Sequence, residues 1–334
     1  MKISRPLGIL LWPLSAIYGA AARIRASLYA HDWLRRKRLS RPVISVGNLT
    51  VGGTGKTPMV IWLAEQFLAE GKGVGILSRG YRGTSGTSDE IELMKQRLGG
   101  RALFGVGKDR YAEGKRLESE GADVFLLDDG FQHMQLARDV DIVLIDRLQP
   151  PSEDKVLPAG RLREPLSAVN RADLVVYTRT DKAERTVRAI QALKKCPIFP
   201  ASTKLVGFRI CSVSHEMLPV SDLGAGKYFA FCGIGNPEGF FVDLKRWGVS
   251  VAGTRVFRDH HKYNVAEVGE LEAAAASADA AGLVTTEKDF YNLRGLGTSR
   301  LPLYICVIAL DLGDGQQFFH AVAEKLGRRQ SVAV

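Results

Sequence analysis

Cysteine is scarce in this 334-residue sequence, and no two of the four cysteines form a C-x-x-C pair. They lie far apart, at Cys196, Cys211, Cys232 and Cys306. This spacing argues against a disulfide framework and against a cysteine-based zinc cluster. It favours a protein of a reducing compartment such as the cytosol.

A continuous apolar run long enough to span a membrane is also missing. An uncharged stretch between Arg5 and Arg23 comes nearest, but Pro13 interrupts it and a spanning helix needs about 20 apolar residues. The sequence shows no internal repeat and no long low-complexity segment. Its hydrophobic content of 46% and charged content of 25% are ordinary for a globular protein, and its length favours two domains.

Acidic residues are nearly missing from residues 1–42. This arm holds nine lysines and arginines against Asp32 alone, so it carries +8 of the net charge of +10. Such a local excess indicates an anionic surface as partner. Apolar residues recur at helical spacing after Pro13, and the basic cluster Arg35–Arg38 follows. The pattern predicts an interfacial helix on an anionic membrane.

Three other interpretations of the arm compete with this one. The helix could pack its apolar stripe on the protein's own core. Gly19–Ala22 could mark a signal-peptide cleavage site, but export would separate the phosphate-binding loop described next from cytosolic ATP. Nucleic-acid binding leaves the apolar stripe, including Trp12 and Tyr18, without a role. The membrane interpretation therefore places Trp12 and Tyr18 near lipid headgroups.

A glycine-rich turn follows the apolar run Val43–Val46, which predicts a buried strand. The turn ends in Gly55-Lys56-Thr57, and a helical apolar pattern comes next. Strand, glycine turn and helix form a phosphate-binding loop, in which backbone N–H groups and the helix N-terminus hold phosphates. Thr50 stands where the usual motif has glycine, and a plain turn with a solvated lysine is the alternative. The predicted nucleotide contacts are Thr50, Val51, Gly52, Gly53, Thr54, Gly55, Lys56 and Thr57.

The chemistry of this loop predicts roles for individual side chains. Lys56 would neutralise the β- and γ-phosphates, and the Thr57 hydroxyl would bind Mg²⁺. Asp128 and Asp129 end a later apolar strand, as expected of a second Mg²⁺-anchoring element in phosphate-loop enzymes. The alternative for this pair is a solvated Asp-Asp-Gly turn.

Strands and helices alternate along the rest of the chain. Strands are predicted at 43–46, 73–77, 102–106, 123–127, 141–146 and 173–177, and in a second series at 228–232, 249–256, 283–286 and 303–308. This alternation predicts an α/β fold: a P-loop NTPase-like, mostly parallel sheet with helices on both faces, plus a smaller C-terminal α/β domain. The expected division is an arm at 1–42, a P-loop domain at 43–215 and a smaller domain at 216–334.

Six motifs in a fixed order make the sequence similar to a known family. They are Ser45–Pro58, Ser78-Arg-Gly-Tyr81, Leu127–His133, Leu162-Arg-Glu-Pro165, Asp259-His-His-x-Tyr263 and Thr285–Asp289. With these the chain resembles the tetraacyldisaccharide 4'-kinase family over nearly its whole length, the basic apolar N-terminus included. Thr50 then looks like the family's own form of the loop.

The resemblance implies an ATP- and Mg²⁺-dependent kinase. Its lipid substrate would be the tetraacyl glucosamine disaccharide 1-phosphate of lipid A (lipopolysaccharide) biosynthesis, phosphorylated at the 4'-hydroxyl to give lipid IVA. It implies a peripheral enzyme on the cytoplasmic face of the bacterial inner membrane, with no nucleic-acid partner. Two domains joined by a short strand linker would enclose the site.

The resemblance also implies a catalytic dyad of Asp89 and His260, with His261 as the fallback for His260. A positioned base helps a sugar hydroxyl lose its proton as the phosphoryl group moves. Without the resemblance, Asp89 is an ordinary helix N-terminal carboxylate and His260 an ordinary loop histidine. The predicted catalytic residues are Asp89, His260, Lys56 and Asp129. Four arginines are candidates for binding phosphates of ATP or of the lipid: Arg79, Arg110, Arg161 and Arg163.

Two other functions compete with the kinase. A membrane-peripheral P-loop regulatory NTPase is the main one, since Thr178-Arg-Thr-Asp181 faintly resembles the Asn-Lys-x-Asp guanine reader but lacks its asparagine and lysine. A non-enzymatic membrane scaffold would leave Gly55-Lys56-Thr57 without a purpose. Gly233-x-Gly235 lacks the third glycine of a dinucleotide site and is interpreted as a tight turn.

Overall fold

A computed structural model describes most of the chain: residues 11–80, 88–151, 154–180, 196–210, 217–224, 226–293, 295–296, 298 and 300–332, with side chains as far as residue 328. Several residues named above lie outside the described residues, namely Arg5, Tyr81, Asp181 and Cys211.

The chain divides into two compact units that are discontinuous in sequence. Unit 1 comprises Met1–Gly86, Arg97–Ser202 and Asp311–Val334, and unit 2 comprises Thr87–Gln96 and Thr203–Leu310. These units cut across a linear division at residues 42 and 215, because a helix near residue 90 groups with unit 2 and the last helix with unit 1. As independently folding domains, the linear ranges remain a prediction.

Unit 1 is built on a parallel sheet with β1 at its centre. The strand order is β6-β5-β1-β4-β2-β3, and the start of β7 pairs with β6. All these pairs are parallel. The strands are β1 (Val43–Asn48), β2 (Val74–Ser78), β3 (Leu103–Val106), β4 (Val124–Asp128), β5 (Val140–Asp146), β6 (Leu174–Thr178) and β7 (Ile198–Ile210). The predicted α/β class with a mostly parallel sheet is confirmed.

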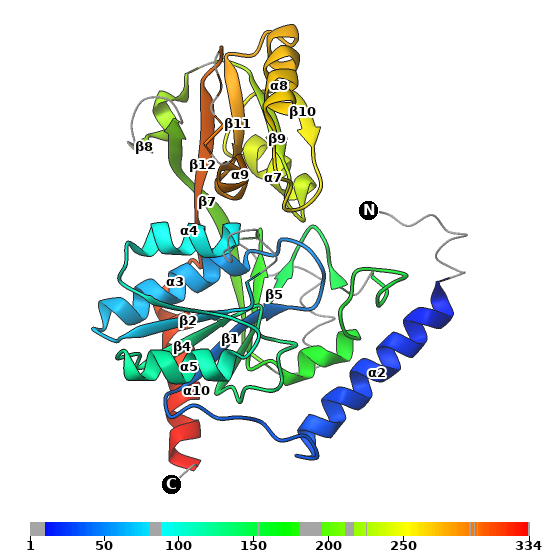
Figure 1. The fold of residues 1–334 in the computed structure, drawn as a ribbon, viewed down its shortest axis with the longest axis vertical. Helices are drawn as coiled ribbons and strands as arrows, with labels where there is room; N and C mark the ends of the chain where they lie inside the picture. Colours follow the sequence, from blue (N-terminus) through cyan, green and yellow to red (C-terminus); the bar gives the residue numbers. More distant parts are fainter. Residues whose placement is uncertain are drawn as a thin grey trace. The chain divides into compact units, whose positions relative to one another are not determined.

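Helices cover both faces of this sheet, which explains why every residue of its central strands β1, β4 and β5 is buried. In Figure 1, α3 and α5 lie on opposite sides of β2 and β4. Phe318 and Phe319 of α10 pack their rings against Trp62 and Phe67 of α3, and so the end of the chain joins unit 1. The helices of unit 1 are α2 (Trp12–Ala30), α3 (Lys56–Ala69), α5 (Arg110–Ser119), the 3₁₀ helix η2 (Leu166–Arg171) and α10 (Gly315–Val332).

Unit 2 is a smaller sheet of the order β10-β9-β11-β12, with the end of β7 beside β12. Its strands β9, β10, β11 and β12 pair in parallel, whereas the short β8 is antiparallel to β7. Alternate residues of β9 enter two apolar clusters, one covered by α7 and one by α8. The elements are α4 (Asp89–Leu98), β8 (Met217–Leu218), η3 (Val220–Leu223), β9 (Tyr228–Cys232), α7 (Pro237–Arg246), β10 (Val251–Val256), α8 (Val265–Ser277), β11 (Gly282–Thr286), α9 (Glu287–Leu293) and β12 (Leu303–Asp311).

Two details differ from the sequence-based expectation. The long strand β7 is not among the strands predicted from the sequence, because Pro200 interrupts it and its polar residues do not alternate regularly. Helix α8 begins at Val265, before the alanine-rich stretch 271–281 whose composition predicts a helix, since Asn264 and Glu267 form a capping box there.

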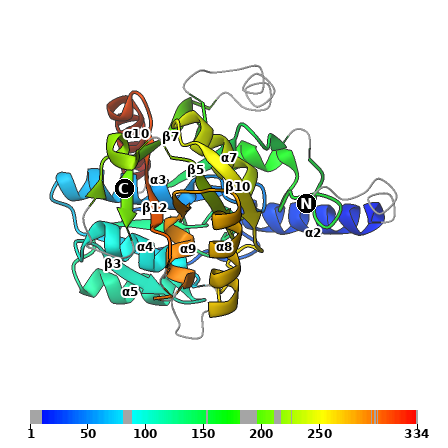
Figure 2. The ribbon, with the colours of Figure 1, turned by 90° about the horizontal axis from the view of Figure 1, so that it is seen from above.

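Helix α2 exposes its apolar stripe instead of burying it. Figures 1 and 2 show α2 on the outside of unit 1, away from α3 and α5. It packs through small residues: Ser15 Oγ accepts from Ala159 N at 2.9 Å, and Gly19 adjoins Pro165. The exposed side chains on the other face are Trp12 (63%), Leu14 (55%), Ile17 (67%), Tyr18 (42%) and Ile24 (61%). Within the described part of the chain, no helix combines the length and apolarity needed to cross a bilayer.

Gly47 illustrates how tightly β1 is packed before the phosphate-binding loop. A Cβ at this position would lie 2.6 Å from Phe131 Cβ and 2.8 Å from Phe131 N, both closer than non-bonded atoms approach. Gly47→Ala is therefore expected to lower the free energy of unfolding by about 1–3 kcal/mol. Gly269→Ala in α8, where nothing lies within 4 Å, should instead raise it by about 0.5–1 kcal/mol. Denaturant unfolding of both variants checks this, and equal stabilities would contradict it.

Candidate functional site

The predicted phosphate-binding loop connects β1 to α3 in unit 1. Residues 49–51 are held by a neighbouring segment, because Val51 N donates to Arg161 O and Arg163 N donates to Leu49 O, each at 2.8 Å. Asn48 Nδ2 donates to Thr54 Oγ1 at 3.0 Å, which ties the start of the loop to its end. The loop is thus fixed from both sides before α3 begins.

Glycine is required where this loop turns into the helix. Gly55 caps α3 with φ +93°, and Gly52 has φ +128°, both in the region that favours glycine. The cap has no side-chain hydrogen bond, so the first N–H groups of α3 are not capped by a side chain. Uncapped N–H groups at a helix N-terminus are well suited to bind an anion such as phosphate. Thr50, Thr54 and Thr57 are buried around the turn.

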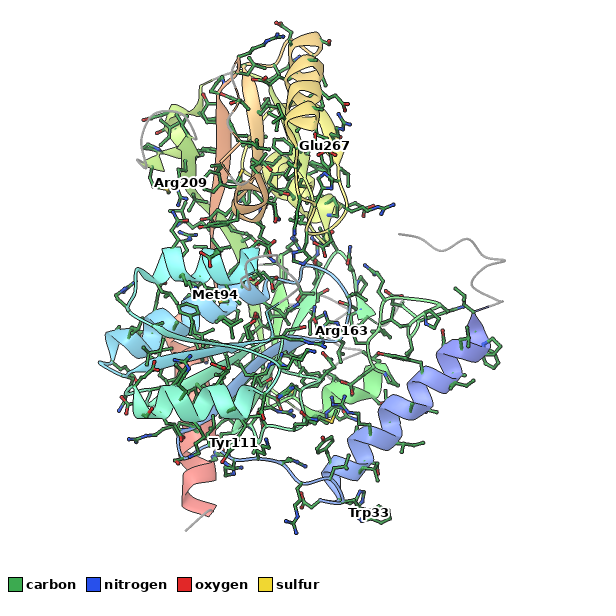
Figure 3. All side chains as sticks on the ribbon, viewed as in Figure 1. Trp33, Met94, Tyr111, Arg163, Arg209 and Glu267 are labelled. Carbon is green, nitrogen blue, oxygen red and sulfur yellow. The ribbon has the colours of Figure 1, made fainter. Side chains whose placement is uncertain are left out.

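Lys56, Asp129 and Arg163 form a cluster of charges beside the loop. Lys56 Nζ lies 3.5 Å from Asp129 Oδ1, and Arg163 Nη1 lies 2.8 and 2.7 Å from the two Asp129 oxygens. Burial raises the pKa of Asp129, but the charges of Lys56 and Arg163 outweigh it and hold that pKa below its usual range. Asp129 is therefore ionised at neutral pH. Arg163 is the labelled side chain near the centre of Figure 3.

Asp128 ends β4 directly beside β1, where it is paired in register with Val46. Its Oδ2 accepts a hydrogen bond from Ser78 Oγ at 3.3 Å, and its residue is 2% exposed. Hydroxyl and carboxylate oxygens are the ligands that Mg²⁺ takes, and in kinases the ion usually binds one or two carboxylates together with substrate phosphates. Because Asp129 is already bound by two cations, Thr57 and Asp128 fit a magnesium ion best. Among the described residues, no three His, Cys, Asp or Glu side chains gather into a metal-binding group.

The four candidate arginines lie in different surroundings. Arg163 binds Asp129, as described. Arg161 Nε donates to Asp154 at 2.6 Å, and Arg110 Nη1 lies 3.2 Å from His133 Nδ1. Burial and the nearby positive charges lower the pKa of His133 to about 4, so it is neutral at pH 7. Arg79 directly follows β2 and is exposed.

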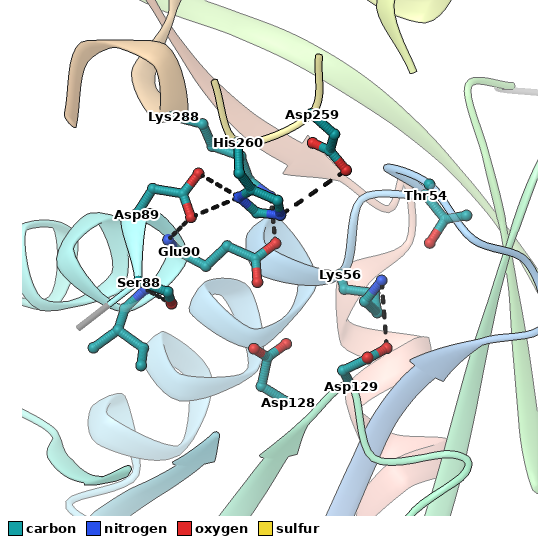
Figure 4. Close-up of polar contacts among 12 residues, drawn as sticks. Thr54, Lys56, Ser88, Asp89, Glu90, Asp128, Asp129, Asp259, His260 and Lys288 are labelled. Carbon is teal, nitrogen blue, oxygen red and sulfur yellow. Dashed lines mark hydrogen bonds and ion pairs between the residues drawn. The ribbon is translucent and has the colours of Figure 1, made fainter. Parts of the chain in front are cut away.

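Asp89 and His260, 171 positions apart in the sequence, are in contact within unit 2. Figure 4 shows His260 Nδ1 facing the carboxylate of Asp89, at 3.1 Å from Oδ1 and 3.0 Å from Oδ2. Since an ionised carboxylate only accepts hydrogen bonds, Nδ1 of His260 carries the proton. The Asp89 side chain is 5% exposed and that of His260 is 38% exposed. His261, the fallback, instead contacts Glu267 at 3.0 Å.

The pKa values of this pair diverge. Burial raises the pKa of Asp89, but the hydrogen bond from His260 and the charge of Lys288 outweigh it and leave the pKa below its usual value. The hydrogen bond to Asp89 raises the pKa of His260 above its usual value, against the opposite effect of burial. Asp89 is thus an ionised carboxylate held by a histidine donor, and a proton acceptor has to be ionised.

Several residues of these two groups were not singled out from the sequence. In unit 1 they are Asn48 and Gln132, whose Nε2 donates to Asn48 O at 3.0 Å. In unit 2, Lys288 pairs with Glu90, and Asn292 Nδ2 donates to Asp89 at 3.3 Å. Gln132 and Lys288 lie inside two of the motifs quoted above, and their place in a motif could have marked them as candidate site residues. Asn292 carried no such signal.

The chain is similar to known proteins over most of its length. The family model described as tetraacyldisaccharide-1-P 4'-kinase (LpxK) matches residues 7–327. The tetraacyldisaccharide 4'-kinase of Geobacter sulfurreducens is 41% identical over 326 residues, which are 92% of this chain and 90% of that protein. The protein of the same name from Geobacter metallireducens is 41% identical over 336 residues, covering 95% and 98% of the two chains.

A solved structure is similar over the same length. LpxK from Aquifex aeolicus, an "apo" form crystallised in complex with ATP, superposes with a TM-score of 0.72 at 31% identity. The match covers 96% of this chain and 99% of that one. Both compact units are therefore shared with the relative, and not the phosphate-binding loop alone. This chain belongs to the tetraacyldisaccharide 4'-kinase family.

Proposed function

We propose that this protein transfers the γ-phosphoryl group of ATP to the 4'-hydroxyl of a tetraacyldisaccharide 1-phosphate, giving lipid IVA. The observation that carries the proposal is membership of the kinase family over nearly the whole chain. The loop that ends in Gly55-Lys56-Thr57, with ionised Asp129 beside it, supplies the parts that phosphoryl transfer needs.

The proposed roles follow from the contacts of each side chain. Backbone N–H groups of residues 52–57 hold the phosphates, and Lys56 neutralises their charge. Thr57 and Asp128 would hold Mg²⁺, which would supply charge neutralisation on the phosphates. Asp129 orients Lys56 and Arg163 through the ion pairs at 3.5 and 2.7 Å. Asp89 accepts the proton of the acceptor hydroxyl, and His260 orients Asp89.

Transfer of label into lipid tests the proposal. The purified protein is incubated with Mg²⁺ and γ-labelled ATP, with and without tetraacyldisaccharide 1-phosphate in mixed micelles. Label in the lipid, at the 4' position, is expected. Release of free phosphate regardless of lipid, with nothing transferred, would instead support the regulatory NTPase, which family membership does not favour.

We further propose that the protein is peripheral, binding the cytoplasmic face of the inner membrane through α2. Five large apolar side chains of this helix are exposed, whereas Ser15 and Gly19 face the rest of unit 1. The exposed Trp33 and the basic cluster 35–38 follow the helix, and Figure 3 labels Trp33 there. Apolar residues next to a basic cluster are typical of a helix that lies in an anionic membrane interface.

Two charges placed on the exposed face of α2 should weaken membrane binding. Ile17 and Ile24 are 67% and 61% exposed, and burying an isoleucine in an apolar phase contributes about 1.5–3 kcal/mol. Ile17→Glu combined with Ile24→Glu is therefore expected to reduce partitioning by at least about 10-fold. Sedimentation with vesicles of phosphatidylcholine and phosphatidylglycerol measures this. Val265→Glu, a 74% exposed position in unit 2, is the control, and unchanged partitioning of the double variant would disprove the role of α2.

A further inference from the structure

Helix α9 carries three polar residues with different partners, all within unit 2. It spans Glu287–Leu293, and the motif Thr285–Asp289 leads into it. Lys288 and Asn292 contact α4, whereas Asp289 contacts the loops around His260. The function proposed above gives this motif no role, although it lies against both members of the Asp89–His260 pair.

Asp289 is a fully buried carboxylate with a complete set of donors. Its Oδ1 accepts from Gly233 N and from Tyr263 Oη, both at 2.7 Å, and its Oδ2 accepts from Thr286 Oγ1 at 2.6 Å. The residue has no exposed surface. Burial raises the pKa of Asp289 even though these three hydrogen bonds act in the opposite direction. Burying a carboxylate away from water is unfavourable. The groups that hydrogen-bond to Asp289 should therefore explain why it is there.

The partners of Asp289 position the backbone of His260. Gly233 N binds Asp289, and the carbonyl of the same Gly233 accepts the N–H of His260 at 3.0 Å. His260 has a left-handed φ of +57°, which costs a non-glycine residue about 1–2 kcal/mol and needs support from its surroundings. Tyr263, the other partner, packs edge-on against the ring of His261. Asp289 therefore supports the loop that carries His260 and His261 (the histidine loop) at two places, Gly233 and Tyr263.

The same helix holds the aspartate. Asn292 Nδ2 donates to Asp89 Oδ2 at 3.3 Å, and Lys288 pairs with Glu90, the residue after Asp89. Tyr291 also donates to Gln96 of α4. The glutamate and aspartate charges raise the pKa of Lys288 against the effect of its burial, so Lys288 stays a cation. Two turns of one helix thus contact both the aspartate and the histidine loop.

We propose that α9 aligns the dyad, and that Asp289 is the positioning residue that sets His260 against Asp89 through Gly233 and Tyr263. This inference rests on the proposed function, in which the dyad acts on the acceptor hydroxyl. Because Asp289 reaches His260 only through other groups, its loss should disturb the geometry of the pair and leave nucleotide binding in unit 1 intact. A misplacement of about 1 Å in such a pair lowers turnover by as much as about 100-fold.

The test combines kinetics with a spectroscopic measurement on the full-length protein. Asp289→Asn keeps the shape of the side chain but replaces Oδ2 with an amide NH₂ group. This group donates hydrogen bonds, whereas the hydroxyl of Thr286 needs an acceptor there. It is expected to lower kcat about 10- to 100-fold with an unchanged KM for ATP. NMR titration of ¹³C-labelled histidine, without substrates, should show the pKa of His260 falling towards its usual value of about 6.5. The charged groups near this ring are Asp89, Glu90, Asp259 and Lys288.

Tyr263→Phe is the second variant, because it removes one of the three hydrogen bonds and keeps the ring. It should shift the pKa of His260 in the same direction by a smaller amount. Tyr228→Phe is its matched control: Tyr228 is another buried tyrosine of unit 2, and its hydroxyl binds Leu223 O. An unchanged pKa of His260 in both folded test variants would overturn the proposal, as would an equal shift in Tyr228→Phe. A wild-type protein that transfers no label would contradict the proposed function, while the NMR titration would still report on the alignment.

Discussion

Replacing Asp89 with asparagine is expected to lower kcat by about 10²–10⁴-fold while the KM for ATP stays within about twofold of the wild-type value. An amide cannot accept the proton of the sugar hydroxyl, and Asp89 belongs to unit 2, whereas the phosphate-binding loop belongs to unit 1. The same variant should lower the pKa of His260, because the hydrogen bond to Asp89 is the largest influence that raises it. Label transfer and histidine NMR measure the two effects independently.

Glu92→Gln is the matched control for Asp89. Glu92 is another acidic residue in the first turn of α4, it pairs with Lys95 at 3.4 Å, and its side chain is 41% exposed. Losing an exposed ion pair of this kind changes little, so kcat and the pKa of His260 should match the wild type. Activity of the asparagine variant equal to that of Glu92→Gln would rule out Asp89 as the base.

Replacing Lys56 with alanine should have an effect of similar size through a different step. Lys56 is 11% exposed and lies 3.5 Å from Asp129, so its ammonium acts in a largely desolvated site. Removing one such group, aimed at charge that develops during transfer, lowers kcat by about 10²–10³-fold. The KM for ATP should also rise, unlike in Asp89→Asn, because the proposed role of the lysine is to bind the phosphates of the nucleotide.

Lys72→Ala provides the comparison for Lys56. Lys72 is exposed beyond the end of α3 and carries the same charge, so it reports any general effect of net charge. Its kinetic constants should equal those of the wild type. A Lys56→Ala variant that keeps both kcat and the KM for ATP would contradict the assignment of this loop to the nucleotide.

Much of the fold was predictable because it follows from local patterns. The apolar run at Val43–Val46 and the glycine turn after it predicted β1, the loop and α3. Both signals lie within a short stretch of the sequence and can be recognised without the rest of the fold. The long strand β7 was not predictable, because its place is decided by the strands beside it rather than by its own alternation.

The sequence by itself determined the family, the parallel sheet and the chemistry offered at each position. The tertiary structure alone decided which of those groups meet. Arg163, one of four candidate arginines, reaches Asp129 across 34 positions, and α9 lies against both Asp89 and the His260 loop. The tertiary structure also decided that the apolar stripe of α2 faces outward, because Ser15 and Gly19 make the contact with the rest of unit 1. Local periodicity reports what a segment can bury, whereas contacts between distant segments depend on how whole elements pack.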